Sequence, residues 1–317
     1  MLTLTSCCLT ARILPLGASL AGLWHKDVPH SLVLGSPDET AYESDLMYFG
    51  SIVGPIANRI AGAQLSIGVK TYRMEANDGK NCLHSGSNGT HALTWDVEEQ
   101  REDSITLRVA LPDGAAGLPG NRVITACYRV TDDAELHLTL TATSDADTVM
   151  NPAHHPYWSL DGCDTVGGHE LHINADEYLP VNDQVLPIGT VTPVDDTRHD
   201  FRRLAAVPID MILDENFCLA DARHTSPVHA ATLIGSNGVK LDVETTEPGL
   251  QVYNGSGFTG SDCILLDDRR LIPFAGVALE PQGWPDAPNQ PHFPSIALKA
   301  SATYRQHTIY RLSTQLS

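Results

Sequence analysis

The sequence has few positive charges. Lys and Arg supply only 20 of its 317 residues against 39 Asp and Glu, which gives a formal net charge of −19. A surface this acidic repels nucleic acid phosphates and anionic lipid head groups. We therefore expect neither nucleic acid nor a membrane as a partner, and a neutral small molecule fits better than a polyanion.

Long hydrophobic runs and paired cysteine motifs are also missing. Nothing approaches the roughly 18 consecutive apolar residues of a membrane-spanning helix. The apolar N-terminus has no basic leader and is interrupted by Arg12. The seven cysteines include no CxxC motif, and their only cluster is the adjacent pair Cys7 and Cys8, a spacing that rarely forms a disulfide. We expect reduced cysteines, mostly packed as small apolar side chains, in a cytoplasmic protein.

The motifs of several enzyme classes are absent. There is no glycine-rich phosphate loop and no dinucleotide-binding fingerprint, and Gly255–Gly257 does not match the spacing of a nucleophile elbow. His169 and His172 resemble a fragment of a zinc motif. Their separation of three residues does not match the i, i+4 spacing of that motif, and on a strand it points them to opposite faces. We expect no metal and no other cofactor.

Alternation of apolar and polar residues is the dominant pattern. It recurs in the segments 65–69, 104–111, 122–130, 135–143 and 239–243. A period of two is typical of strands that bury one face of a sheet, and clusters rich in Gly, Pro, Asn and Asp separate the runs. The sequence therefore predicts an all-β sandwich or barrel, in a single domain over residues 1–317. We expect only short helices, one of them near Phe201–Ala206.

The segment Asn151–Leu160 concentrates polar and aromatic residues after a predicted strand. It contains the adjacent histidines His154 and His155, and Pro152 and Pro156 bar both a regular helix and a fully paired central strand. We expect the histidines to lie where a strand enters an irregular connection, which suits a binding or catalytic edge. This pattern does not distinguish the two histidines, and two loop histidines without a function are the alternative.

Glu280 is the acid with the strongest functional signal. It ends the apolar run Val277–Leu279, which should be buried, and a buried carboxylate is costly unless it is hydrogen-bonded or used. Three other polar residues break the strand alternation, and each has a structural alternative. The alternative for Arg59 is a structural salt bridge. For His84 it is a place in an exposed loop, and for Asp214 it is a place in a solvated acidic turn.

The residue types in these clusters point to a sugar-like ligand. They are His, Glu, Asp, Asn, Gln, Arg, Tyr and Trp. Amides and carboxylates bind hydroxyl groups, and aromatic faces pack on the C–H side of a sugar. His and Glu together also supply an acid/base pair.

The order of the motifs resembles the aldose 1-epimerase (galactose mutarotase) family over about residues 50–310. The matching segments are Asn58-Arg59, Leu83–Gly86, Asn151–Leu160, Asp214–Phe217, Pro248–Tyr253 and Leu279–Pro291. Each motif is weak alone, but their joint order is specific. The alignment places His155 at the family's catalytic histidine.

Three residues depart from the family pattern. Ser85 stands where the family has glycine, His154 where it has asparagine, and Glu215 where it has histidine. We expect Ser85 to add bulk beside His84 and the other two to change the polarity of the sugar-binding rim. These departures bear on the choice of sugar more than on the reaction.

The resemblance implies an antiparallel β-supersandwich with an open cleft for a free monosaccharide. Glu280 would be the general base that removes the proton from the anomeric hydroxyl. His155 would be the general acid that protonates the ring oxygen. The ring opens, the C1–C2 bond rotates, and the carbonyl closes on its other face, so that the α and β anomers interconvert.

The resemblance also implies the sugar-binding residues. His84 and Asp214 would hold the ring-oxygen side and the hydroxyls, and Arg59 and Gln251 would complete the contacts. An isomerase of this kind consumes no cofactor. We expect it to work as a monomer or homodimer.

Other functions on the same fold stay open. A mutarotase for hexose 6-phosphates needs a basic cluster, and among the matched motifs only Arg59 of the Asn-Arg pair brings one base. A non-catalytic sugar sensor does not need both His155 and Glu280, and both are present. A glycosidase is disfavoured because no second matched carboxylate accompanies Glu280.

Overall fold

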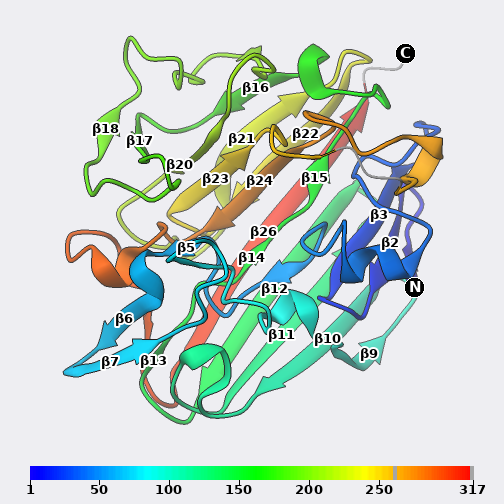
Figure 1. Cartoon of the computed structure of the whole chain (residues 1–317). Helices are drawn as coiled ribbons and strands as arrows, with labels where there is room; N and C mark the ends of the chain where they lie inside the picture. Colours follow the sequence, from blue (N-terminus) through cyan, green and yellow to red (C-terminus); the bar gives the residue numbers. More distant parts are fainter. Residues whose placement is uncertain (260–262, 315–317) are drawn as a thin grey trace.

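The structure is a computed structural model that describes residues 1–259 and 263–314. Two large antiparallel sheets, one of nine strands and one of six, form its main layers (Figure 1). Smaller strand pairs and short helices connect and border them. The all-β antiparallel architecture expected from the alternating segments is confirmed.

The nine-stranded sheet contains most of the alternating segments. Across the sheet its strands are β19 (Ala205–Ala206), β16 (Glu170–Ile173), β21 (Val228–Ile234), β22 (Val239–Thr245), β26 (Thr303–Thr314), β12 (Glu135–Ser144), β11 (Arg122–Val130), β10 (Ser104–Leu111) and β9 (Asp96–Gln100). Along β10, Ile105, Leu107, Val109 and Leu111 are buried and alternate with more exposed residues. One face of this sheet therefore forms core, as the period of two predicts.

The six-stranded sheet contains three of the matched motifs, those of Asp214, Gln251 and Glu280. Its strands in order are β15 (Tyr157–Trp158), β24 (Val277–Gln282), β23 (Gly249–Tyr253), β20 (Asp214–Cys218), β17 (Glu177–Leu179) and β18 (Thr192–Pro193). All six residues of β24 are buried. This central strand therefore has no solvent-facing side, and Glu280 lies within it.

Apolar side chains from both large sheets pack into one cluster. Leu107 and Leu138 of the nine-stranded sheet share it with Phe217, Val252 and Leu279 of the six-stranded sheet. Each such side chain contributes roughly 1.5–3 kcal/mol when it is fully buried. The cluster fixes one sheet against the other and so fixes the strands that position the polar motifs.

Smaller elements complete the fold. The minor sheets are β1 (Leu2–Thr5), β2 (Leu9–Leu14) and β3 (Ser19–His25), and the pairs β4 (Ile52–Val53) with β14 (Ala153–His154), β5 (Arg59–Ile60) with β8 (Cys82–Leu83), β6 (Gln64–Ile67) with β7 (Lys70–Arg73), and β13 (Thr148–Val149) with β25 (Ala297–Leu298). The helices are single 3-10 turns: η1 (Glu39–Glu43), η2 (Ala61–Ala63), η3 (Thr90–Ala92), η4 (Ala115–Gly117), η5 (Val166–Gly168), η6 (Leu266–Asp268) and η7 (Ala287–Asn289).

The helix expected near Phe201–Ala206 is wrong. Phe201 is buried in the main core, and Ala205 and Ala206 pair with Leu171 and Glu170 to form the edge strand β19. Pairing with a neighbouring strand satisfies the backbone there, so local helix propensity does not decide the structure.

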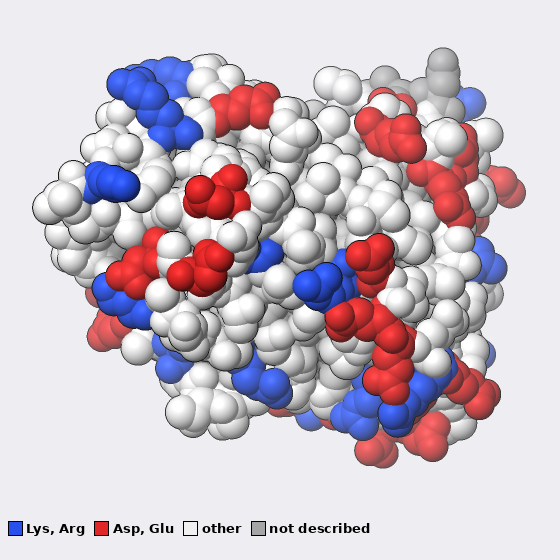
Figure 2. Space-filling view, turned by 90° about the horizontal axis from the view of Figure 1, so that it is seen from below, with Lys and Arg blue, Asp and Glu red and all other residues white. Residues whose placement is uncertain are grey.

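Six of the cysteines, Cys7, Cys8, Cys82, Cys127, Cys163 and Cys218, are free thiols, but the expected burial of the cysteines is only partly correct. Cys82 and Cys218 are buried, whereas Cys7 and Cys163 are exposed. Acidic and basic side chains are interspersed on the face in Figure 2. In the described part of the chain, no helix is long and apolar enough to cross a membrane.

Candidate active site

Backbone hydrogen bonds fix the position of His155 beside β24. His155 N–H donates to Ser51 O at 3.0 Å, and Gly50 N–H donates to His155 O at 2.9 Å. The Asn151 side chain donates to Gly283 O at 3.1 Å and accepts from Gly283 N–H at 2.6 Å. The segment that contains His155 is therefore bound to the end of the strand that contains Glu280. His155 lies directly after β14, in the short irregular connection to β15, as expected.

His155 and Glu280 face each other inside the protein. His155 Nε2 lies 3.4 Å from Glu280 Oε1, and the side chains are only 5% and 3% exposed. Both line a cavity of about 220 Å³, here called the central cavity. Its lining residues are Tyr48, Asn58, Arg59, Leu83, His84, His155, Tyr157, Asp214, Tyr253 and Glu280. Five of the six expected site residues therefore meet in one cavity.

Burial shifts both groups of the pair toward their neutral forms. It raises the pKa of Glu280 well above its ordinary value, the Asp214 carboxylate raises it further, and Arg59 opposes the shift. Burial lowers the pKa of the His155 imidazole to about 4. A neutral imidazole beside a protonated carboxyl holds as many protons as an imidazolium beside a carboxylate. The pair thus holds one exchangeable proton that either group can take.

His84 is a neutral hydrogen-bond donor to the central cavity. The backbone N–H of Asn58 donates to His84 Nδ1 at 3.1 Å, so this nitrogen carries no proton. Burial holds the pKa of His84 well below its ordinary value, and the nearby His155 lowers it further. The ring is therefore neutral with its proton on Nε2. His84 itself has a positive φ of 49° at the end of β8.

Arg59 forms an ion pair and also lines the cavity. Its Nε donates to Asp78 Oδ2 at 2.7 Å, and its Nη1 lies 3.8 Å from Asp214 Oδ2. Arg59 therefore both forms a structural salt bridge and lines the candidate site. Sequence reasoning missed the contact of Asp78 with Arg59, because Asp78 lies in none of the matched motifs.

Asp214 is held between Arg59 and Gln251. Gln251 Nε2 donates to Asp214 Oδ1 at 2.6 Å, and Gln251 is 3% exposed. Burial raises the pKa of Asp214 to about 6, and both Arg59 and the hydrogen bond from Gln251 oppose the shift. Gln251 lines a smaller cleft with Asp214, Asn58 and Asn216. The hydrogen bond from Gln251 orients the Asp214 carboxylate.

Tyrosines form much of the remaining wall. The Tyr48 ring lies 4.8 Å from the His84 ring and 6.2 Å from the His155 ring, measured between centroids. Tyr253 lies opposite Asp214 in the β20–β23 register. Both tyrosines were missed as site residues. Tyr253 stands in a matched motif and was detectable, whereas Tyr48 lies in none.

His154 is not on the rim of the cavity, so that expectation is wrong. It is buried between Tyr128 and Tyr310, and its Nδ1 lies 3.1 Å from the Tyr310 hydroxyl. Because successive side chains of a strand point to opposite faces, β14 directs His154 into the core and His155 into the cavity. The extended backbone thus distinguishes the two histidines.

Ser85 and Glu215 bind backbone close to the site. The Ser85 hydroxyl accepts from Ile56 N–H at 2.9 Å and donates to Ile56 O at 3.0 Å. Ser85 is therefore a structural link, and the expectation that it adds bulk beside His84 is not supported. The Glu215 carboxylate accepts from Asp214 N–H at 2.7 Å and lies 3.4 Å from His199 Nε2.

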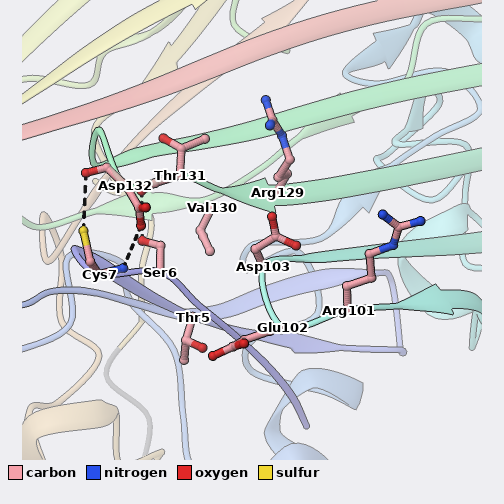
Figure 3. Close-up of a pocket in the computed structure, with 10 residues that line it drawn as sticks. All are labelled: Thr5, Ser6, Cys7, Arg101, Glu102, Asp103, Arg129, Val130, Thr131 and Asp132. Atoms are coloured by element: carbon pink, nitrogen blue, oxygen red, sulfur yellow. Dashed lines mark hydrogen bonds between the residues drawn. The ribbon is translucent and has the colours of Figure 1, made fainter.

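A larger cavity elsewhere lacks this chemistry. It measures about 630 Å³ and includes Cys7, whose backbone N–H donates to Asp132 Oδ1 at 3.0 Å and whose thiol donates to Asp132 O at 3.6 Å (Figure 3). Its wall contains Arg101, Arg129 and acidic residues but no histidine among the described residues. No cluster of three or more His, Cys, Asp or Glu in residues 1–259 and 263–314 is arranged to hold a metal ion. The smaller central cavity is therefore the candidate active site.

The chain matches known proteins over nearly its whole length. The family model described as aldose 1-epimerase matches residues 1–311. Galactose mutarotase of Mus musculus is 32% identical over 317 residues, covering 96% of this chain and 91% of that protein. Aldose 1-epimerase of Escherichia coli K12 is 31% identical over 295 residues, covering 88% and 84%.

A solved structure agrees with the sequence matches. The crystal structure of an aldose epimerase homologue from C. elegans superposes with a TM-score of 0.91 at 31% identity. The superposition covers 99% of this chain and 98% of the other. Fold, sequence and motif order agree along the chain. The protein belongs to the aldose 1-epimerase family.

Proposed function

We propose that the protein is an isomerase that interconverts the α and β anomers of a free monosaccharide. The observation that supports this function most directly is the 3.4 Å approach of His155 Nε2 to Glu280 Oε1 inside a cavity of about 220 Å³. Relatives named galactose mutarotase and aldose 1-epimerase add support.

Glu280 and His155 move two protons in the proposed reaction. The Glu280 carboxylate accepts the proton of the anomeric hydroxyl, while the His155 imidazolium donates its proton to the ring oxygen. The C1–O5 bond breaks, and C1 becomes a carbonyl. The pair then consists of a protonated carboxyl and a neutral imidazole, which are the forms that burial favours. Rotation about C1–C2 and the reverse transfers close the ring on the other face.

His84, Asp214 and Arg59 would bind the sugar, with His84 Nε2 as a donor on the ring-oxygen side. Asp214 would accept hydrogen bonds from ring hydroxyls, in the orientation that Gln251 gives it. Arg59 already pairs with Asp78 and lies close to Asp214. An acidic site of this kind favours a neutral sugar over a sugar phosphate.

Substitution of either member of the pair tests the mechanism. Glu280→Gln removes the base and His155→Asn removes the acid, so each should lower kcat by roughly 10²–10⁴-fold. Polarimetry of freshly dissolved α-glucose and α-galactose measures the rate, and circular dichroism checks the fold. Glu170→Gln and His172→Asn, both on β16 of the nine-stranded sheet and outside the lining of the central cavity, are the matched controls. Wild-type rates in both site variants would refute the mechanism.

The location and assembly of the protein are part of the proposal. Cys7, Cys8, Cys82, Cys127, Cys163 and Cys218 are free thiols, which suits a reducing compartment such as the cytoplasm. One chain supplies every residue of the central cavity, so a monomer or a homodimer would be active.

A further inference from the structure

Two thiols lie side by side at the turn between β1 and β2. Consecutive side chains of a strand point to opposite faces, but Ser6–Cys8 lies between the two strands, so this rule does not apply to it. Cys7 Sγ lies 3.3 Å from Cys8 Sγ. Both thiols donate to the same carbonyl oxygen, Asp132 O, Cys7 at 3.6 Å and Cys8 at 3.1 Å. The two sulfurs are therefore on the same side of the turn.

Hydrogen bonds hold this turn in one shape. The Ser6 hydroxyl accepts from Cys8 N–H at 3.2 Å and donates to Thr131 O at 2.9 Å. The backbone N–H of Cys7 donates to Asp132 Oδ1 at 3.0 Å (Figure 3). The turn is thus attached to the connection between β11 and β12. A ligand that needs both sulfurs does not have to order the turn first, which lowers the cost of binding.

The adjacency of the two cysteines disfavours a disulfide between them. Successive Cα atoms lie about 3.8 Å apart, whereas the Cα atoms of a disulfide usually lie about 4.4–6.8 Å apart. Hydrogen bonds with Cys8 and Asp132 also raise the pKa of the Cys7 thiol to about 11, so little thiolate is present to attack an oxidant or a disulfide. The pair therefore stays a dithiol, and it is accessible because Cys7 is exposed and Cys8 half-buried.

The distance between the sulfurs fits two bonds to one thiophilic centre. Arsenic–sulfur bonds are similar in length to the Zn–S bond of about 2.3 Å, and two such bonds at roughly 90° span about 3.3 Å. Trivalent arsenic is pyramidal, with angles close to this value. Structural zinc instead takes four tetrahedral ligands. Within the part of the chain that the structure describes, no group of three or more His, Cys, Asp or Glu could hold a metal ion. The pair therefore suits a centre that needs only two protein ligands.

A cavity beside Cys7 has room for the remainder of such a ligand. It is called the Cys7 cavity here and measures about 630 Å³. Its lining residues are Thr5, Ser6, Cys7, Arg101, Glu102, Asp103, Arg129, Val130, Thr131 and Asp132 (Figure 3). Guanidinium groups stack on aromatic faces, so Arg101 and Arg129 suit an aryl group. An organic group on arsenic would occupy the third position, which the two cysteines leave open.

We propose that Cys7 and Cys8 chelate a trivalent organoarsenical, with its one organic group in the Cys7 cavity. The step is a condensation with an arsenic oxide. Two S–H bonds and the bond from arsenic to its oxo oxygen break, two As–S bonds form, and the oxygen leaves with both protons as water. Arsenic stays trivalent, so the step needs no oxidant or reductant. This site shares no lining residue with the central cavity and goes beyond the proposed isomerase function.

Phenylarsine oxide is the probe that tests this inference. Native mass spectrometry of the wild-type protein in excess 2-mercaptoethanol should show one phenylarsine group per chain, and 2,3-dimercaptopropanol should remove it. The excess monothiol displaces arsenic that is held by a single cysteine. Cys7→Ser and Cys8→Ser should each weaken binding by about 100-fold or more, because the second As–S bond forms within the molecule only when both thiols are present. Alanine replaces serine at either position if a variant misfolds.

Cys163→Ser is the matched control, because Cys163 is also an exposed thiol and lies outside the Cys7 cavity. It should bind phenylarsine oxide as the wild type does, and circular dichroism checks the fold of every variant. Wild-type protein without the adduct, a site variant that retains it, or equal loss in Cys163→Ser would each overturn the inference. These results would leave the proposed function intact, because the described lining of the central cavity contains no cysteine.

Discussion

His155 and Glu280 hold one exchangeable proton, and this single feature sets the pH range of the proposed reaction. Burial opposes charge on either group, yet the reaction needs a carboxylate and an imidazolium at its start. The two arrangements differ only in the position of the proton. A substrate hydroxyl close to Glu280 and a ring oxygen close to His155 would stabilise the charged arrangement through hydrogen bonds.

The dependence of kcat on pH should therefore be bell-shaped with an unusually low acid limb. As the pH falls through about 4, His155 and Glu280 are both protonated, so no base is left and kcat decreases. At high pH the pair loses its proton, and kcat falls because no acid is left. The measurement is kcat by polarimetry across the pH range, corrected for the uncatalysed rate, with circular dichroism at each pH.

An acid limb centred near the ordinary histidine pKa of about 6.5 would contradict this expectation. It would mean that the imidazole in the working enzyme is solvated, unlike the buried ring in the free site. The control is the same profile for His172→Asn, which should follow the wild-type curve.

Among the strands, the local pattern predicted the elements but not their partners. The alternating segments at 104–111 and 122–130 became β10 and β11 with the expected bounds. The pairing of β26 with both β12 and β22 joins positions as distant as Glu135 and Arg311, and no local signal specifies such contacts. The helix expected near Phe201–Ala206 failed for the same reason, because a strand pairing formed there.

In the candidate site, too, some residues were predictable from the sequence and others only from the fold. Residues in matched motifs, such as His84 and Glu280, were predictable and meet in the central cavity. Tyr48 lies outside every motif, and only the folded chain places it there. His154 was predictable in principle, because the alternation of a strand at Ala153–His154 already separates it from His155.

The link between Asn151 and Gly283 should matter for both stability and alignment of the pair. Asn151→Ala leaves the buried N–H and C=O of Gly283 without partners, which should cost roughly 1–3 kcal/mol in the free energy of unfolding. We also expect kcat to fall, because the segment that contains His155 loses its attachment to β24. Urea unfolding followed by tryptophan fluorescence measures the stability change.

Asn88→Ala is the matched comparison, because Asn88 is exposed and makes one long hydrogen bond of 3.4 Å to Ser87. Its stability should stay within about 0.5 kcal/mol of wild type. Stability of Asn151→Ala equal to that of Asn88→Ala would mean that water satisfies the Gly283 backbone equally well.

The main hydrophobic cluster connects the two large sheets of the molecule. It contains Trp95, directly before β9 at one edge of the nine-stranded sheet, and Trp158 in β15 of the six-stranded sheet. Neither sheet has a separate core within this cluster, since side chains of both interdigitate in it. On this basis we propose that residues 1–317 form one domain and unfold together.

Unfolding should then be a single cooperative transition. Far-UV circular dichroism reports the strands of both sheets, and tryptophan fluorescence reports the four tryptophans, of which Trp95 and Trp158 lie inside the shared cluster. The two signals should give the same midpoint and the same apparent free energy in urea, because loss of the cluster removes the support of both sheets at once. Separate midpoints, or an intermediate that retains strand signal after the tryptophans are exposed, would show that one sheet is stable without the other.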